Sequence, residues 1–500
     1  MTLRLSADSG DGREDLPGGG AGELPPGWAR ATLGELGEWY GGGTPSKKRP
    51  EFWTDGTIPW LSPKDMGPDV LVATQDLIHE SALDDSPVKL VPAGSVAVVV
   101  RSGILERKVP VTYVPFEVTL NQDMKAVAPY EGIDGRWLAW AIRAQERYIL
   151  ANCRKQGTTV ASLEVPWLMD TEVLVPPLAE QHRIVAEIEQ QISHIGTGEA
   201  AAHAALSSAA SLAEQITTRG ARGCLEDVDL SPAPLEKADI DDGIIPDLPA
   251  GWNWARLGEI AVVVGGVTKD SKRQSDPDYV EVPYLRVANV QRGKLILGKV
   301  TTIRVPPEKA ESLRLEPGDI LLNEGGDRDK LGRGWVWEGQ IENCIHQNHV
   351  FRARVIERKI HPKLLAWHAN GFGKAWCDRN GTQSVNLASI SLRKIKLLPV
   401  PIPPPEIQEQ LVKIIELHLE SVATARSTAE GALAHAQELR AALLQAAFTG
   451  TLVPQDPADE PASVLLDRIR ATRATAKKAP RKRAPRKPRS APPGQEELPQ

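Results

Sequence analysis

The 500-residue chain is predicted to be an α+β protein in which two duplicated domains are separated by long helical spacers that form an antiparallel coiled coil. Its length exceeds what one hydrophobic core organises, so two or three domains are expected. The stretch LPPGWARATLGEL at residues 24–36 returns as LPAGWNWARLGEI at residues 248–260. After each copy comes a stretch of about 40 residues with apolar side chains at helical spacing.

The composition is typical of globular proteins. The chain is 41% hydrophobic and 25% charged, with a net charge of −6. No apolar run approaches the roughly 20 residues that a membrane-spanning helix needs. Residues 1–22 lack a positive start followed by an apolar core, which predicts a disordered extension rather than a secretory signal. The four cysteines form no CxxC pair, so a reducing, cytoplasmic location is expected.

The repeat extends well beyond the opening segments. At an offset of 224 residues, IPWL at 58–61 aligns with VPYL at 282–285, and Gly157-Thr158 aligns with Gly381-Thr382. From Pro176-Pro177 onward the offset is 227, because these residues align with Pro403-Pro404. Such a long period predicts domain duplication rather than a solenoid of short repeats.

Each copy begins with a β-rich part. Short apolar runs at residues 96–100 and 319–322 follow Pro-Gly-type turns, and runs at 173–175 and 397–400 close the two parts. These runs predict strands. Helical stretches lie between them, so an α+β domain with a twisted sheet is expected. The predicted helical stretches are residues 136–150 and 363–376.

Each copy ends with a helical part. Pro177 and Pro405 mark the two helix starts, since proline is accepted in a first turn but not in a helix interior. About 40 residues give a helix of about 60 Å, which outruns a small domain. We therefore expect the two apolar stripes to pack on each other rather than each on its own domain. The stripes include Ile184, Ile188, Ile192, Leu206, Leu212, Leu411, Ile415, Leu439 and Leu443.

These patterns, with the flanking segments, divide the chain. The predicted parts are an extension (1–22), a first globular domain (23–176), a central spacer (177–225), an acidic linker (226–247), a second globular domain (248–402), a C-terminal spacer (403–455), a helical segment (456–475) and a disordered basic tail (476–500). Prolines interrupt the cations of the tail, so it cannot form a regular helix. The tail either contacts phosphates without sequence preference or only adds solubility.

Motifs for catalysis are absent from the sequence. It contains no GxxxxGK[ST] phosphate-binding loop and no Ser/His/Asp set that can be proposed without assuming proximity. Cys344, His346 and His349 lie close enough to consider zinc, but the first copy lacks such ligands and no second ligand pair is evident. The sequence therefore favours a binding or scaffolding protein, and no metal or cofactor is predicted on the chain itself.

Polar loops recur at matching positions of the two copies. A Gly-rich loop near the start of each copy ends in cations, and its glycines let the backbone approach a ligand closely. Further loops follow the central strands, at residues 101–103 and 323–333. A single loop of this kind is usually a solvated turn, but matched loops in duplicated domains favour a nucleic-acid surface. The candidate DNA-binding residues are Thr44, Ser46, Lys47, Lys48, Arg49, Arg101, Thr158, Lys269, Lys272, Arg273, Arg328, Lys330, Arg333 and Gln383.

Several segments resemble the DNA-specificity subunit of type I restriction–modification systems. The opening at residues 24–36, with IPWLSPKDM after it, is similar to the start of a target-recognition domain. PPLAEQHRIVAEIE and PPPEIQEQLVKIIE are similar to the start of the family's helical spacers, although the second copy has Gln408-Glu409-Gln410 in place of a simple Glu-Gln. The most specific similarity is AAFTGTLVPQDPADEPASVLLDRI at residues 446–469, which resembles the family's C-terminal segment.

The resemblance implies a non-catalytic subunit whose two target-recognition domains each read one half of a bipartite, asymmetric DNA target. It implies two methyltransferase subunits, which bind S-adenosylmethionine and methylate adenine, docked on the helices, and restriction subunits that cleave DNA with ATP and Mg²⁺. Spacers of about 50 Å predict half-site centres roughly 10 to 15 base pairs apart. Two alternatives remain open: a fused type IIG or IIB enzyme, and a scaffold that does not bind DNA.

Overall fold

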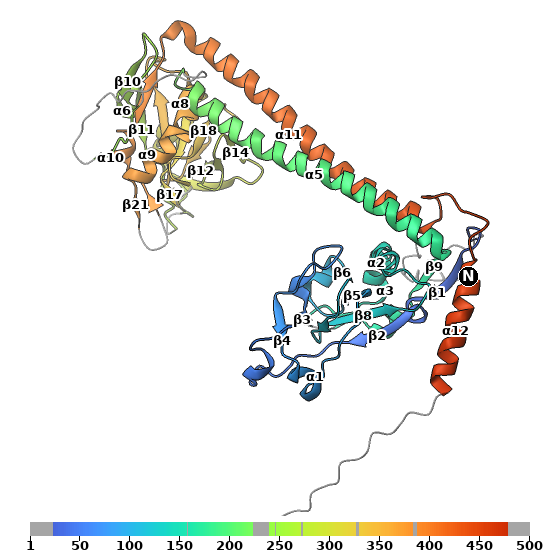
Figure 1. Ribbon diagram of the computed structural model, residues 1–500. Coiled ribbons are helices and arrows are strands. Elements are labelled where there is room, and N and C mark those ends of the chain that lie inside the picture. Colours follow the sequence, from blue (N-terminus) through green and yellow to red (C-terminus); the bar gives the residue numbers. More distant parts are fainter. Residues whose placement is uncertain are drawn as a thin grey trace, which may run out of the picture. The chain divides into compact units, whose positions relative to one another are not determined.

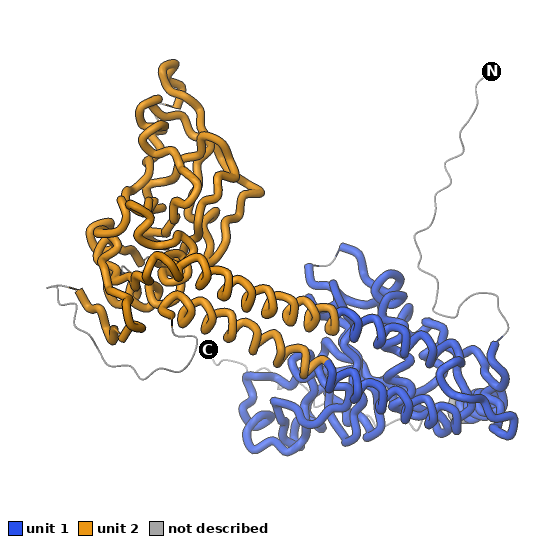
Figure 2. Tube along the Cα trace, turned by 90° about the horizontal axis from the view of Figure 1, so that it is seen from above, with its two compact units in different colours: residues 1–198, 434–500 blue, residues 199–433 orange. Residues whose placement is uncertain are grey.

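The computed structural model describes residues 24–157, 159–223, 240–245, 247–271, 274–326, 330–383 and 388–478. The chain forms two compact units, one of residues 1–198 and 434–500 and the other of residues 199–433 (Figure 2). The predicted disordered segment 1–22, most of the acidic linker and residues 479–500 of the basic tail lie outside the described residues. None of the helices in the described parts combines the length and apolar content needed to cross a membrane.

The described residues of the first unit form three sheets and several short helices (Figure 1). A four-stranded antiparallel sheet has the order β2 (Gly37–Gly41), β8 (Met124–Pro129), β5 (Ser95–Val99) and β6 (Val111–Val114). A three-stranded sheet has the order β4 (Asp76–Ile78), β3 (Ile58–Leu61) and β7 (Thr119–Leu120), and β1 (Ala29–Thr32) pairs with β9 (Glu172–Val175). The α-helices before the spacer are α1 (Ser81–Asp85), α2 (Gly135–Ala144), α3 (Glu146–Asn152) and α4 (Val165–Met169).

The second unit repeats this topology strand by strand. Its four-stranded sheet has the order β11 (Ala261–Val264), β20 (Val350–Val355), β16 (Ile320–Asn323) and β18 (Gly334–Val336). Its three-stranded sheet has the order β15 (Thr301–Val305), β12 (Val280–Leu285) and β19 (Ile345–His346), and β10 (Asn253–Arg256) pairs with β23 (Pro399–Ile402). In both units the last strand of the three-stranded sheet runs parallel to its neighbour. The predicted duplication is therefore confirmed.

Small elements complete the second unit. They are β13 (Val290–Gln291), β14 (Lys294–Leu295), β17 (Gly325–Gly326), β21 (Thr382–Gln383), β22 (Ala388–Ser389), α6 (Leu257–Ile260), α7 (Pro307–Leu313), α8 (Pro362–Asn370), α9 (Phe372–Asn380) and α10 (Leu392–Ile395). Strands β5, β16, β9 and β23 lie at the four predicted apolar runs. The two predicted helical stretches are each broken into two helices, at Gln145 between α2 and α3 and at Gly371 between α8 and α9.

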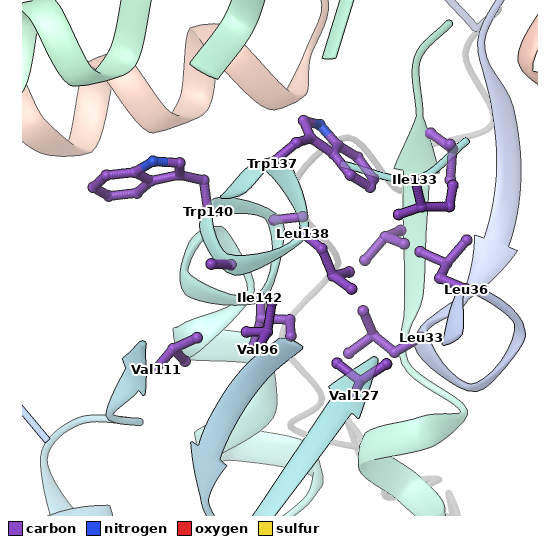
Figure 3. Close-up of a cluster of buried hydrophobic side chains, with 14 of the residues drawn as sticks. Leu33, Leu36, Val96, Val111, Val127, Ile133, Trp137, Leu138, Trp140 and Ile142 are labelled. Atoms are coloured by element: carbon purple, nitrogen blue, oxygen red, sulfur yellow. The ribbon is translucent and has the colours of Figure 1, made fainter. Parts of the chain in front are cut away.

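The core of the first unit forms between helix α2 and the four-stranded sheet (Figure 3). Asp134 begins α2 by accepting a hydrogen bond from the backbone N–H of Trp137 at 2.7 Å, which satisfies one of the free donors of the first turn. The helix then buries Trp137 and Ile142. Strand β5 is buried along its whole length, because its alternate side chains enter two different apolar clusters.

The two long helices are α5 (Leu178–Gly220), with 43 residues, and α11 (Pro405–Phe448), with 44 residues. The start of α5 and the end of α11 share one core in the first unit, and the end of α5 and the start of α11 share one in the second. Within each unit the two helices lie side by side (Figures 1 and 2). They therefore run antiparallel, as predicted.

Where the helices pack differs from the prediction. Ile184 and Ile188 are completely buried in the core of the first globular domain, and Ile192 and Leu443 pack against that core. Ile415 is completely buried in the second core, and Leu411 packs against it. The prediction that the helices pack on each other rather than on their own domains is wrong at the helix ends, because these ends pack on both.

The seam farther along the helices consists mainly of alanines. Ala202, Ala209 and Ile216 follow Ile188 at multiples of seven residues and are all buried. The corresponding positions of α11 include Ala429 and Ala436, also buried. A heptad spacing keeps these side chains on one face. Two leucines that were assigned to the stripe lie off this face and are exposed, Leu212 at 49% and Leu439 at 44%.

A glutamine fixes the start of each long helix. The Gln181 side chain accepts a hydrogen bond from the backbone N–H of Asp134 at 2.8 Å and donates one to the carbonyl of Pro176 at 3.0 Å. Gln408 accepts from the backbone N–H of His361 at 2.7 Å and donates to the carbonyl of Pro403 at 2.9 Å. Gln408 is therefore the counterpart of Gln181, and the extra glutamine of the second copy is Gln410.

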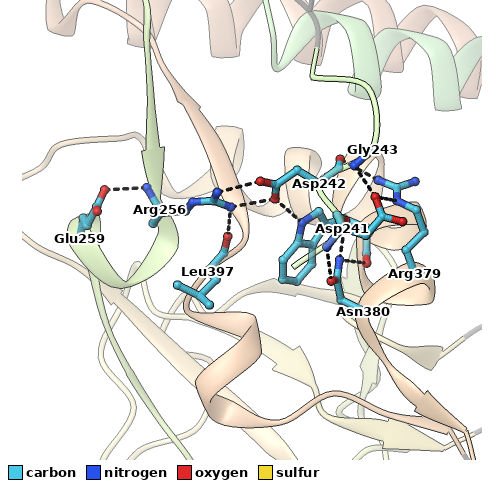
Figure 4. Close-up of polar contacts among 9 residues, drawn as sticks. Asp241, Asp242, Gly243, Arg256, Glu259, Arg379, Asn380 and Leu397 are labelled. Atoms are coloured by element: carbon cyan, nitrogen blue, oxygen red, sulfur yellow. Dashed lines mark hydrogen bonds and ion pairs between the residues drawn. The ribbon is translucent and has the colours of Figure 1, made fainter. Parts of the chain in front are cut away.

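Segments outside the repeat also pack onto the domains. In the first unit, helix α12 (Ala462–Lys478) adds Leu465, Leu466 and Ile469 to the core, and it extends three residues into the predicted tail. In the second unit, Asp242 from the end of the linker forms an ion pair with Arg256 at 2.7 Å and accepts from Trp376 at 2.9 Å (Figure 4). Burial raises the pKa of Asp242, but these hydrogen bonds and the nearby guanidinium charges outweigh burial and lower it overall.

Candidate nucleic-acid interface

The Gly-rich loop of the first unit packs against the turn at residues 121–123. The backbone N–H of Gly43 donates to the carbonyl of Leu120 at 2.8 Å, and the Thr44 hydroxyl donates to the side chain of Gln122. A Cβ at Gly42 would lie 1.8 Å from the carbonyl oxygen of Asn121. The counterpart glycine, Gly266, has the same constraint, with its Cβ position 2.0 Å from the carbonyl oxygen of His346. These two glycines therefore serve a close approach within the protein, and the expectation that the loops approach a ligand stays a prediction.

The cations of this loop differ in their surroundings. Arg49 is held by Glu51 at 2.7 Å and Asp85 at 3.2 Å, and its guanidinium lies 4.0 Å from the ring centre of Phe52. Ser46, Lys47 and Lys48 are exposed, and neither lysine has an ion-pair partner among the described residues. The two lysines are thus available to an anion, whereas Arg49 stabilises the loop.

Arg101 joins the same edge of the first domain. It follows strand β5, is 60% exposed, and forms an ion pair with Asp123 at 3.0 Å. Its backbone pairs with Ser162, so the described residues 154–157 and 159–163 lie beside it. The Gly-rich loop, the 121–123 turn, Arg101 and this segment are therefore brought together. Thr158 lies outside the described residues.

The second domain places a carboxylate–histidine contact at the same edge but one residue earlier, because Glu324 corresponds to Val100 and not to Arg101. Glu324 follows strand β16 and accepts from His349 at 2.6 Å, and the Glu324 N–H donates to the His349 carbonyl at 2.9 Å. In the first domain the Val100 N–H donates to the Asp123 carbonyl at the same distance, 2.9 Å. His349 therefore corresponds to Asp123. An open groove of about 530 Å³ lies here, lined by Val287, Glu324, Gly325, Gly326, His349, Thr382, Ala388 and Ser389.

The remaining candidates of the second domain are scattered. Lys269 is exposed and Lys330 is half-buried. Arg333 is only 8% exposed, unlike the exposed loop cation that the sequence predicts, and it directly precedes strand β18. Gln383 belongs to the short strand β21. The other three candidates, Lys272, Arg273 and Arg328, lie outside the described residues.

The hairpin beside these loops corrects the alignment of the two copies. Arg154 pairs with Leu163 in the first unit, and Thr382 pairs with Ser389 in the second. The backbone N–H of Leu163 donates to the carbonyl of Val100, and that of Ile390 donates to the carbonyl of Glu324. Leu163 thus corresponds to Ile390, at an offset of 227 residues. The proposed match of Gly157-Thr158 with Gly381-Thr382 is therefore wrong.

Asp123, Glu324 and His349 are further candidates for the interface that the sequence prediction did not include. A signal for Asp123 and His349 existed, since Asn121-Gln122-Asp123 and Gln347-Asn348-His349 are polar triplets at matching positions.

His346 and His349, which the zinc alternative groups together, lie in different surroundings. His346 is buried, its Nδ1 lies 2.6 Å from the carbonyl of Val350, and burial lowers its pKa to about 4. No group of three or more potential metal ligands occurs among the described residues.

Comparison with known proteins agrees with this duplicated architecture. A family model for the type I restriction modification DNA specificity domain matches residues 25–200 and again residues 249–424. A similar protein is the EcoR124I/EcoR124II specificity subunit of Escherichia coli, 46% identical over 159 residues, or 32% of this chain and 39% of that protein. The MjaIX specificity subunit of Methanocaldococcus jannaschii is 24% identical over 55% of this chain and 61% of that protein. The StySPI specificity subunit of Salmonella potsdam is 24% identical over 91% of this chain and 97% of that protein.

Solved structures share the fold. One chain, from a study of complex assembly and conformational transition of the type I R-M system, aligns with a TM-score of 0.65 at 19% identity, over 86% of this chain and 100% of that chain. The HsdS subunit from Thermoanaerobacter tengcongensis aligns with a TM-score of 0.53 at 18% identity, over 87% of this chain and 99% of that chain. With the family model matching both copies of the repeat, the chain belongs to the family of type I restriction–modification DNA-specificity subunits.

Proposed function

We propose that the chain reads a bipartite, asymmetric DNA target, one half with each globular domain, within a type I restriction–modification complex. The observation that carries this proposal is the edge after the central strand, where Arg101 pairs with Asp123 in one domain and Glu324 contacts His349 in the other. Base edges are distinguished by their pattern of donors and acceptors. Since the two domains offer different groups on the same framework, their half-sites should differ in sequence.

The chemistry of these groups suits reading and holding DNA. A guanidinium such as that of Arg101 donates two hydrogen bonds to the O6 and N7 of guanine, and a carboxylate such as that of Glu324 accepts from the N4 amine of cytosine. Asp123 and His349 would hold these side chains in place before DNA arrives. Lys47 and Lys48 would contact phosphates, which adds affinity without sequence preference and makes binding depend on salt.

Catalysis would belong to partner subunits in the cytoplasm. Two methyltransferase subunits docked on the helices would bind S-adenosylmethionine and methylate adenine, and restriction subunits would use ATP and Mg²⁺ to cleave. The spacer residues Leu411 and Ile415 would contribute by holding the second domain and its helices together. The chain's own residues bind and orient the DNA.

Methylome sequencing of cells that express the chain with its methyltransferase subunit tests the proposal. The expected motif has two specified halves, different in sequence, separated by a degenerate gap. Exchanging residues 24–175 for those of a homologue should change one half only. A continuous motif, or a change in both halves, would contradict independent reading by the two domains.

The two alternatives predict other results. A fused type IIG or IIB enzyme would transfer methyl groups as the purified chain alone. A scaffold unrelated to DNA would give a complex whose weak DNA binding shows neither sequence preference nor salt dependence.

A further inference from the structure

The turns at residues 121–124 and 347–350, beside the Gly-rich loops, are built in the same way. In each turn the backbone N–H of the fourth residue donates to the carbonyl of the first, at 3.0 Å in the first domain and 2.9 Å in the second. The N–H of the first residue donates to the end of a neighbouring strand, to the carbonyl of Leu61 at 2.8 Å and to that of Leu285 at 2.9 Å. The second residues of the two turns are therefore equivalent.

Both second residues carry a side-chain amide at the candidate interface. They are Gln122, which is exposed, and Asn348, which is partly exposed. An amide presents an acceptor oxygen and a donor nitrogen side by side. This pair matches the edge of adenine in the major groove, where the N6 amine donates and N7 accepts, whereas guanine has two acceptors there.

Different contacts within the protein orient the two amides. The hydroxyl of Thr44 donates to the side-chain oxygen of Gln122, and that oxygen has a second lone pair. The side-chain nitrogen of Asn348 lies 3.4 Å from Nε2 of His349, whose Nδ1 lies 2.6 Å from a carboxylate oxygen of Glu324. In the neutral ring Nδ1 donates to the carboxylate and Nε2 accepts from the amide. Each amide therefore retains an acceptor lone pair and an N–H for DNA.

A shared structural role does not explain why both turns have an amide. Elsewhere the repeat keeps a contact and changes the residue. Arg143 donates to the carbonyl of Val111 at 2.6 Å. Asn370, at the equivalent position, donates to the carbonyl of Gly334 at 2.8 Å. At the turns the amide is the same and its partners within the protein differ, so a common partner is expected outside the protein.

We propose that Gln122 and Asn348 each read one A·T base pair, the amide oxygen accepting from N6 of adenine and the amide nitrogen donating to N7. The inference rests on the proposed function and names residues that give the two half-sites a common feature. The half-sites still differ elsewhere, as the third residues of the turns do, Asp123 and His349. An adenine held through N6 stays stacked in the duplex, so it is not the base turned out for methyl transfer. Thr44 and His349 are positioning residues, since each acts through the amide.

Methylome sequencing of variants tests the assignment, with the full chain co-expressed with the methyltransferase subunit of its system. Gln122→Ala should leave one A·T position of one half-site unspecified, and Asn348→Ala should do so in the other half. Gln122→Glu should shift its position from adenine toward cytosine, because a carboxylate accepts from N4 of cytosine but cannot donate to N7. The controls Gln190→Ala on helix α5 and Gln340→Ala after strand β18 change exposed amides outside the turns and should leave the motif unchanged.

Binding by the wild-type complex gives a measurement that does not depend on how a variant folds. Each adenine of the target is replaced in turn by 7-deazaadenine, which lacks the N7 acceptor. In each half, one adenine other than the methylated one should weaken binding by roughly 2- to 10-fold when replaced, the effect of one lost hydrogen bond. Gln122→Ala should bind the target substituted in its half and the unmodified target equally.

Two results would overturn the reading of A·T pairs while a bipartite motif still supports the proposed function. In one, no adenine other than the methylated one is sensitive to the replacement. In the other, Gln122→Ala keeps the complete motif. A continuous motif for wild type would overturn the proposed function itself, and the reading of two A·T pairs with it.

Discussion

Removing the amide of Gln181 should destabilise the first domain through two identified backbone groups. Gln181 is completely buried, and its side chain satisfies the N–H of Asp134 and the carbonyl of Pro176. Gln181→Ala leaves both groups unpaired inside the protein. A buried polar group without a partner costs about 1–3 kcal/mol, so a loss of about 2–6 kcal/mol is expected. Gln408→Ala should cost more, because Gln408 also donates to the carbonyl of Lys359 at 3.1 Å.

Hydrogen–deuterium exchange of the full chain measures this locally, and thermal denaturation measures it globally. The amide of Asp134 should exchange faster in Gln181→Ala, and that of His361 should do so in Gln408→Ala. The matched control is Gln190→Ala, an exposed position on the same helix as Gln181, where a change within about 0.5 kcal/mol is expected. If Gln181→Ala exchanged and melted like Gln190→Ala, the amide would not fix the start of helix α5 and the reasoning would be refuted.

Four further outcomes are expected. Arg101→Ala should weaken target binding by about 1–3 kcal/mol and relax one half-site, as read from DNA binding and methylome sequencing, whereas Arg468→Ala on the exposed face of α12 should do neither. Gly42→Ala places a Cβ against the carbonyl of Asn121 and should lower both the melting temperature and DNA affinity, whereas Gly67→Ala, with nothing within 4 Å, should not. Because the pKa of Asp242 is lowered in the fold, its carboxylate stabilises the second domain above about pH 4 and loses this effect as the pH falls. Asp242→Asn should therefore flatten the acid side of a stability–pH curve, and an unchanged slope would argue against this role of Asp242. Leu411→Asp should abolish co-purification with methyltransferase subunits, because it puts a charge against the second core, and normal assembly would contradict this; the control Leu417→Asp is at a 62% exposed position.

The main architecture could be predicted because its signals are local or repeated. Pro177 and Pro405 marked the helix starts, and apolar runs such as 96–100 marked buried strands. The helix seam was predicted less well. Counting large apolar residues selected Leu212, whereas burial favours Ala202 and Ala209, whose small side chains matter only once a second helix lies against them.

The candidate interface was predicted in part, because its pairs depend on tertiary contacts. The loop positions followed from the repeat, but Arg101 and Asp123 are separated along the chain and meet only when strands β5 and β8 pair. The purpose of Gly42 was likewise hidden, since the backbone that it approaches belongs to another strand's turn. Burial of Arg333 could not be read from a polar loop sequence.

The hydrogen bonds of Arg143 and Asn370 bear on how the two halves of such a protein diverge. Each side chain donates to a carbonyl of the same strand of its domain, Val111 in β6 and Gly334 in β18. After the duplication the donor was free to change, provided that the carbonyl kept one. The two halves therefore keep the same hydrogen bond to the backbone although the side chain that makes it has changed. In duplicated domains, contacts of the main chain can reveal common origin where the amino-acid sequences no longer match.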